Sequence, residues 1–173
     1  MKQIRLTGSG GQGIITIAII LAEAAVAQGK QVVQTQSYGP EARGGSSKAE
    51  VIISHKPISY PKVTHPDLVL AMTQESSDQY TKDLSENDMV VIDTTFVQQM
   101  PDTSAKVIAA PITQTARDQL GRELFSNIIA LGLIGKVSGL VEKEILQQAV
   151  LARVPKGTEE KNIQAFELGW NLQ

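Results

Sequence analysis

The glycine-rich stretch Gly8–Gly13, close to the start of the chain, constrains the possible fold more than any other feature. A short β-compatible segment, Lys2–Leu6, precedes it, and a long apolar run, Ile14–Gln28, follows it. A strand, a glycine turn and a helix in this order open an α/β fold. Glycine lacks a Cβ, so the turn can take positive φ angles and let a ligand approach. The first N–H groups of the helix would then suit an anion such as phosphate. The candidate site residues are therefore Gly8, Ser9, Gly10, Gly11, Gln12 and Gly13.

Three interpretations of this stretch stay open. Gly8, Gly10 and Gly13 fit the dinucleotide pattern G-x-G-x-x-G. That pattern needs an acidic residue about 20 positions further on to hold the ribose, and the next predicted strand, Gln31–Ser37, has only glutamine and serine there. No Gly-Lys-Ser/Thr closes the turn, so a Walker loop is excluded. The stretch is a structural turn, a phosphate or pyrophosphate site other than NAD, or an atypical NAD(P) or flavin site.

A second glycine-rich loop leaves the carboxyl end of the strand Gln31–Ser37, and its sequence is Ser-Tyr-Gly-Pro-Glu-Ala-Arg-Gly-Gly-Ser. Open α/β sheets place ligands at that end of their strands. Arg43 could hold a phosphate or carboxylate with two parallel hydrogen bonds, or it could pair with Glu41 and only shape the loop. We therefore add five candidate cofactor-binding residues, namely Tyr38, Glu41, Arg43, Gly44 and Gly45.

The rest of the chain predicts further strands and then helices. The strand Lys48–His55 follows too soon for a crossover helix, so it should run antiparallel to the strand before it. Buried strands are expected at 67–72, 89–93 and 106–110, a short helix at 73–83, and helices at 115–120, 123–137, 142–153 and from Thr158 on. This pattern predicts a three-layer, Rossmann-like α/β fold with a mixed, mostly parallel sheet and a helical C-terminal third. The length favours a single domain over residues 1–173.

Three features of these elements have two interpretations each. The helix Ile14–Gln28 is apolar nearly all round, so either a neighbouring helix or another chain must cover it. Asp93, at a strand's carboxyl end, either has a functional role or opens a turn. Asn127 lies in an apolar segment, and its amide is expected to bond to loop backbone in preference to taking part in catalysis.

Composition excludes several kinds of chemistry. The chain has no cysteine, so it carries no disulfide, no thiolate nucleophile and no cysteine-ligated iron–sulfur cluster. Its two histidines, His55 and His65, are ten positions apart with no carboxylate at metal-ligand spacing, and we predict no metal site and no catalytic residue. A net charge of −2 without a basic run argues against nucleic acid. No secretion signal or membrane-length apolar run is visible, so we expect a cytoplasmic protein without membrane contact.

Taken together, four motifs resemble the gamma subunit of 2-oxoacid:ferredoxin oxidoreductases. They are the loop Gly8–Gly13, the long loop from Ser37 to Gly45, Asn127 with Leu131-Gly132, and Lys161-Asn162 before Ala165-Phe166. The second loop is the more specific of the two glycine-rich motifs. The resemblance covers essentially the whole chain, and among the branches it is strongest for the 2-oxoglutarate enzyme, with the pyruvate and branched-chain enzymes next.

The resemblance implies a complex that decarboxylates a 2-oxoacid on thiamine diphosphate, sends electrons through iron–sulfur clusters to ferredoxin and passes the acyl group to coenzyme A. This chain has neither cluster cysteines nor the diphosphate–magnesium motif, so those cofactors are expected on partner subunits. The partners would be alpha and beta subunits and, as an open alternative, a ferredoxin-like delta subunit. The chain would bind no cofactor alone and would act as an accessory subunit near the coenzyme A site. The alternative is a free-standing nucleotide-binding oxidoreductase with an atypical glycine-rich loop.

Overall fold

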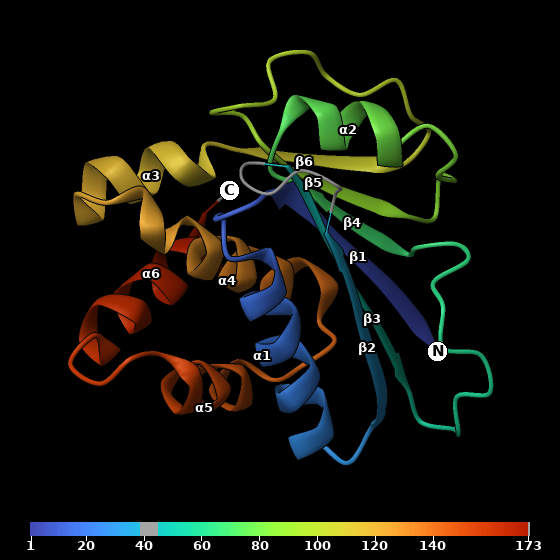
Figure 1. The fold of residues 1–173 in the computed structure, drawn as a ribbon, viewed down its shortest axis with the longest axis horizontal. Helices are drawn as coiled ribbons and strands as arrows, with labels where there is room; N and C mark the ends of the chain where they lie inside the picture. Colours follow the sequence, from blue (N-terminus) through green and yellow to red (C-terminus); the bar gives the residue numbers. More distant parts are fainter. Residues whose placement is uncertain (39–44, 173) are drawn as a thin grey trace.

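A six-stranded sheet in the order β2-β3-β1-β4-β5-β6 forms the middle layer of the computed structural model, which describes residues 1–38 and 45–172 (Figure 1). The strands β1, β4, β5 and β6 are parallel neighbours, whereas β3 is antiparallel to both β1 and β2. The predicted mixed, mostly parallel sheet is therefore confirmed. Its strands are β1 (Lys2–Ser9), β2 (Gln31–Tyr38), β3 (Ser46–Ser54), β4 (Leu68–Ala71), β5 (Met89–Asp93) and β6 (Lys106–Ala110).

Helices cover the two faces of the sheet unequally, as Figure 1 shows. Five helices gather on one face, and α2 (Gln74–Tyr80) is the one described helix on the other, where it packs on β4. The residues after β6 are almost entirely helical, which confirms the predicted helical C-terminal third. The five helices are α1 (Ile14–Ala27), α3 (Ile112–Leu120), α4 (Ser126–Ser138), α5 (Lys143–Arg153) and α6 (Glu159–Asn171), with a short 3-10 helix η1 (Glu123–Phe125) leading into α4.

Helix α1 is sandwiched within the chain itself. It packs on the sheet through β1, β2 and β3 and contacts α4 and α5 on its other sides. Its exposed positions include Thr16, Glu23, Val26 and Ala27. The continuous apolar run of α1 is thus explained by neighbouring helices of the same chain.

Glycines bring α4 and α6 into close contact. A Cβ on Gly169 would lie 1.9 Å from the backbone oxygen of Ile129, and a Cβ on Gly132 would lie 2.3 Å from that of Phe166. Phe166 is fully buried and stacks on Trp170, with 5.7 Å between ring centroids. Only residues without a Cβ allow two helix backbones to approach this closely, so these glycines set the spacing of the C-terminal layer.

The structure corrects several predicted bounds. The first strand runs to Ser9 instead of Leu6, because β1 and β3 stay paired as far as Ser9 and Ser46. Helix α2 is shorter than predicted, α3 starts earlier, at Ile112, and residues 123–125 are 3-10 and not α-helical. The last helix begins at Glu159 and not at Thr158, whose hydroxyl donates to the Pro155 carbonyl and does not cap the helix.

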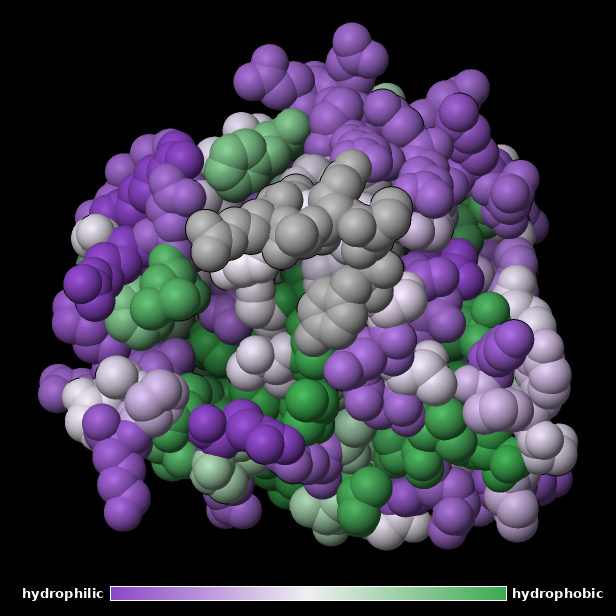
Figure 2. Space-filling model, viewed as in Figure 1, coloured by the Kyte–Doolittle hydropathy of each residue, from purple (hydrophilic) through white to green (hydrophobic). Residues whose placement is uncertain are grey.

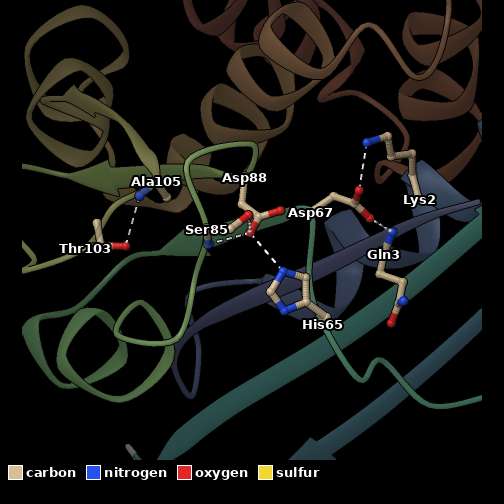
Figure 3. A network of polar contacts seen from close by, with 8 residues as sticks. All are labelled: Lys2, Gln3, His65, Asp67, Ser85, Asp88, Thr103 and Ala105. Carbon is tan, nitrogen blue, oxygen red and sulfur yellow. Dashed lines mark hydrogen bonds and ion pairs between the residues drawn. The ribbon is translucent and has the colours of Figure 1, made fainter.

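A polar network fixes the amino ends of the parallel strands (Figure 3). Asp67 accepts hydrogen bonds from the Lys2 ammonium at 2.7 Å and from the Gln3 N–H at 2.8 Å. Buried Asp88 accepts from both the N–H and the hydroxyl of Ser85 at 2.7 Å and contacts His65 Nε2 at 2.9 Å. Burial alone would raise the pKa of Asp88, but the bonds from Ser85 and the contact with His65 hold it below its usual value. These polar side chains at the amino ends of the strands are therefore hydrogen-bonded, and the glycine loop lies at the carboxyl ends.

Within the described residues, no helix is both long and apolar enough to span a bilayer.

Candidate functional site

The first glycine loop is held in shape by Gln12. The Gln12 side-chain Oε1 accepts a 2.7 Å hydrogen bond from the backbone N–H of Ser9. The backbone N–H of Gln12 in turn donates to the Ser9 carbonyl. A Cβ on Gly8 would lie 2.4 Å from that Oε1, so a larger residue would displace the Gln12 side chain. Gly11 and Gly13 have φ angles of 93° and 72°, in the left-handed region that favours glycine. The loop geometry therefore requires these glycines.

Several N–H groups of this loop have no acceptor among the residues that the structure describes. Among the described residues, none accepts a hydrogen bond from the N–H of Gly11, Gly13 or the first helical residues Ile14, Ile15 and Thr16. The first intrahelical bond runs from Ile17 back to Gly13. The positive end of the α1 dipole adds to the attraction for an anion. This end of α1 has the chemistry of a phosphate site.

The second loop leaves β2 and returns to the first loop. Its residues Glu41, Arg43 and Gly44 lie outside the described residues, so the proposed pair of Glu41 with Arg43 stays a prediction. Tyr38 is the last residue of β2, and at the other end of the loop the carbonyl of Gly45 accepts a 2.7 Å hydrogen bond from the N–H of Gly10. The structure thus brings both ends of the second loop to the sheet edge that carries the first.

A pocket of about 380 Å³ opens beside the first loop. It lies at the carboxyl ends of the parallel strands, since Ser9 ends β1 and Phe96 and Thr113 follow soon after β5 and β6. Phe96 and Leu124 give it an apolar rim, with 38% and 67% of their surface exposed. The residues that line it are Ser9, Gly11, Gln12, Phe96, Thr113, Glu123, Leu124 and Ser126.

Sequence reasoning missed five of these lining residues, Phe96, Thr113, Glu123, Leu124 and Ser126. They come from three separate segments that the fold alone brings to the loop. An exposed phenylalanine shortly after a strand's carboxyl end was the only available signal, because ligands of open α/β sheets bind at that edge.

Asp93 has a structural role at this edge. Its carboxylate is fully buried and accepts hydrogen bonds from the N–H and hydroxyl of Thr113 and from the N–H of Thr95. These bonds cap α3 and close the turn after β5, so the turn interpretation of Asp93 holds. Among the described residues that line the pocket, Glu123 alone carries a carboxylate, and it pairs with Arg117 at 2.6 Å. The described negative charges at this end of the strands are therefore engaged.

The two asparagines of the family motifs meet near the same loop. Asn127 Oδ1 accepts from the N–H of Ile128, and its Nδ2 lies where a Cβ on Gly13 would come within 2.3 Å. Among the described residues, Asn127 thus bonds to the backbone of its own helix and not to loop backbone as predicted. Asn162 is buried, and its Nδ2 donates to the carbonyl and hydroxyl oxygens of Thr158. Both asparagines line a mostly apolar pocket of about 200 Å³.

The described residues contain no group of three or more His, Asp or Glu side chains placed to hold a metal ion. His65 contacts Asp88 at the amino edge of the sheet, far from the glycine loops in sequence and at the opposite ends of the strands.

Comparison with known proteins defines the class. Residues 3–172 match the family described as pyruvate ferredoxin/flavodoxin oxidoreductase. The 2-oxoglutarate synthase subunit KorC of Methanocaldococcus jannaschii is 44% identical over 99% of this chain and 93% of its own. The gamma subunit of a keto/oxoacid ferredoxin oxidoreductase from Geobacter sulfurreducens superposes with a TM-score of 0.87 at 44% identity, covering 98% of this chain and 96% of that one.

A longer protein shares the fold. The 2-oxoglutarate:ferredoxin oxidoreductase of Magnetococcus marinus, solved with 2-oxoglutarate, coenzyme A and succinyl-CoA, matches 98% of this chain with 30% of its own length, at a TM-score of 0.83 and 22% identity. The chain described here belongs to the pyruvate ferredoxin/flavodoxin oxidoreductase family and is a gamma-type subunit of a 2-oxoacid:ferredoxin oxidoreductase.

Proposed function

We propose that this chain is the gamma subunit of a 2-oxoglutarate:ferredoxin oxidoreductase. The observation that carries the proposal is the 44% identity, over nearly the full length of both chains, to a protein named as a 2-oxoglutarate synthase subunit. The complex would convert 2-oxoglutarate and coenzyme A to succinyl-CoA and carbon dioxide, and two electrons would pass to ferredoxin.

Within the complex the chain has an accessory role. Decarboxylation needs thiamine diphosphate and magnesium, and electron transfer needs iron–sulfur clusters. The sequence has no cysteine to ligate a cluster, so alpha and beta subunits, with a ferredoxin-like delta subunit where one is present, hold these groups. This chain contributes protein contacts and part of a substrate site.

That site is the coenzyme A region. Coenzyme A carries phosphates, and the free N–H groups at the start of α1 are suited to one of them. Phe96 and Leu124 on the pocket rim would face the apolar parts of the ligand. Arg43, in the loop whose end Gly45 bonds to Gly10, would supply a fixed positive charge. The enzyme of M. marinus, which shares this fold, was solved with coenzyme A bound, and this supports the proposal.

The test uses the reconstituted complex and two variants of this chain. Gln12→Glu keeps an oxygen for the Ser9 N–H but adds a negative charge beside the free N–H groups, and we expect the KM for coenzyme A to rise about tenfold or more. Arg43→Ala should raise the same KM or weaken assembly, and Arg43→Lys should restore function only in part. The melting temperature of the isolated chain should stay near the wild-type value in each case.

The matched control is Gln148→Glu, which makes the same change on the exposed face of α5. It should leave every kinetic constant unchanged. The KM for 2-oxoglutarate should not move in any variant, because that substrate reacts on a partner subunit. Wild-type KM, kcat and assembly for both Gln12→Glu and Arg43→Ala would show that the glycine loops are structural and would refute the coenzyme A proposal.

A further inference from the structure

Strand β2 is a long edge strand without the usual protection. It pairs with β3 without a bulge from Gln31 and Ser54 to Tyr38 and Ser47, and its other edge pairs with no strand in the described part of the chain. Its eight residues include no charged residue and no proline, the features that commonly protect an edge from pairing. The opposite edge strand, β6, has five residues, carries exposed Lys106 and is followed by Pro111.

Beside β2, on the side of the sheet away from α1, the described residues form a groove. Cross-strand register places Arg5, Glu50 and Thr35 in one row across β1, β3 and β2. Lys48 and Ser37 form the next row toward the glycine loops. The small side chains of Thr35 and Ser37 leave a groove of about 350 Å³, lined by Arg5, Thr35, Gln36, Ser37, Lys48, Glu50, Lys62 and Val63. In Figure 2 strongly hydrophilic residues lie over α2 and also along the left side of the molecule near α3, and green and pale residues lie over the lower parts of β2 and β3.

The groove is positively charged. Its described lining holds three cations, Arg5, Lys48 and Lys62, and one carboxylate, Glu50. The side chain of Glu50 is only 12% exposed and pairs with Arg5 at 2.8 Å and, more loosely, with Lys48 at 3.9 Å, so one carboxylate is shared by two of the three cations. Arg5 and Lys48 also lie over the ring of Tyr80, at 5.3 and 5.8 Å from its centroid. Burial raises the pKa of Tyr80, so the neutral phenol does not offset these cations.

We propose that an extended acidic segment of another oxidoreductase subunit pairs with β2 as a seventh strand and places its carboxylates over this groove, toward Lys48 and Lys62. The inference rests on the proposed function, because the partner is a subunit of that complex. Backbone hydrogen bonds to β2 would give affinity, and the cations would select the partner. A second copy of this chain does not fit, since its β2 has no carboxylate to offer.

The experiment mixes this chain with the purified alpha and beta subunits and measures two quantities. The first is hydrogen–deuterium exchange of the backbone amides at positions 31–38, which should slow on assembly. The second is the affinity of the double variant Lys48→Glu with Lys62→Glu, which should fall about tenfold or more and lose most of its salt dependence. Lys62→Glu alone changes an exposed residue and should give a smaller loss with an unchanged melting temperature.

Lys106→Glu, on the opposite edge strand, is the matched control and should leave the affinity unchanged. If the subunits assemble while positions 31–38 exchange as in the free chain, the β2 proposal is wrong and the proposed function stands. If the wild-type chain does not associate with these subunits, both are wrong. A dimer of this chain alone with slowed exchange at 31–38 would identify a second copy as the occupant and would overturn the proposal.

Discussion

The N–H of Gly10 donates a 2.7 Å hydrogen bond to the carbonyl oxygen of Gly45. This bond joins the two glycine-rich motifs, which are separated by a complete helix and strand in the sequence. It forms where β1 and β3 end their antiparallel pairing, at Ser9 and Ser46. The bond therefore fixes the carboxyl end of the second motif beside the first glycine loop.

Gly13→Ala should destabilise the chain for two reasons. The φ of Gly13 is 72°, which an alanine adopts at a cost, and the added Cβ would lie 2.3 Å from Asn127 Nδ2. We expect the free energy of unfolding, measured by urea denaturation, to fall by about 2–4 kcal/mol.

Gly157→Ala separates the two contributions. Gly157 also has a positive φ, 87°, but nothing lies within 4 Å of an added Cβ. The free energy of unfolding should fall by about 1 kcal/mol in Gly157→Ala, which is the cost of the backbone angle alone. Equal losses of unfolding free energy for the two variants would show that the loop can move away from Asn127, so that Asn127 does not hold the loop in place.

The outcome for individual elements shows what local sequence can predict. Strands β5 and β6 have the predicted bounds, because a clear stop closes each, the Asp93-Thr94 turn or Pro111. The prediction that 106–110 is buried was wrong, since β6 is an edge strand in which Lys106 and Ala109 are exposed. The predicted end of β1 was wrong, because glycines in a sequence indicate a turn unless the strand that pairs with them is known. The contribution of Leu124 to the pocket depends on the long-range packing that brings residues 123–126 to the first loop, and the local sequence gives no signal of it.

Gly169→Ala tests the contact between α4 and α6. The added Cβ would lie 1.9 Å from the Ile129 carbonyl oxygen, a backbone atom that cannot rotate away. Alanine favours a helix over glycine by about 1 kcal/mol, but overpacking should outweigh this and give a net loss of about 2 kcal/mol or more. Gln164→Ala, on the exposed side of α6, should change the stability by less than about 0.5 kcal/mol. A stability gain for Gly169→Ala would contradict the close packing.

Asp88 should make stability depend on pH. Its pKa in the folded protein is lowered, so its contribution is fully present above the unfolded value of about 4 and is lost as the pH falls through the folded value. Asp88→Asn should therefore lower the free energy of unfolding by about 1–3 kcal/mol at pH 7. The difference in unfolding free energy from wild type should shrink below about pH 4. Chemical denaturation across this pH range measures both.

Asp83→Asn serves as the control for this comparison, since Asp83 is exposed. Its free energy of unfolding should equal that of the wild type at every pH. A constant difference between wild type and Asp88→Asn from neutral to acid pH would mean that the carboxylate charge adds nothing beyond its hydrogen bonds.

The isolated chain should not bind NAD(H) or NADP(H), and the topology gives a stronger reason than the missing acid. In a dinucleotide-binding fold the strand that carries the ribose carboxylate lies directly beside the first strand. Here β3 lies between β1 and β2, so the end of β2 is two strand spacings, about 10 Å, from β1 and its glycine loop. Calorimetry should show no micromolar affinity for NADH or NADPH, either in the wild type or in Gln36→Asp, which supplies a carboxylate near the end of β2. Micromolar binding by Gln36→Asp alone would show that only the acid was missing, and micromolar binding by the wild type would restore the nucleotide-dependent alternative.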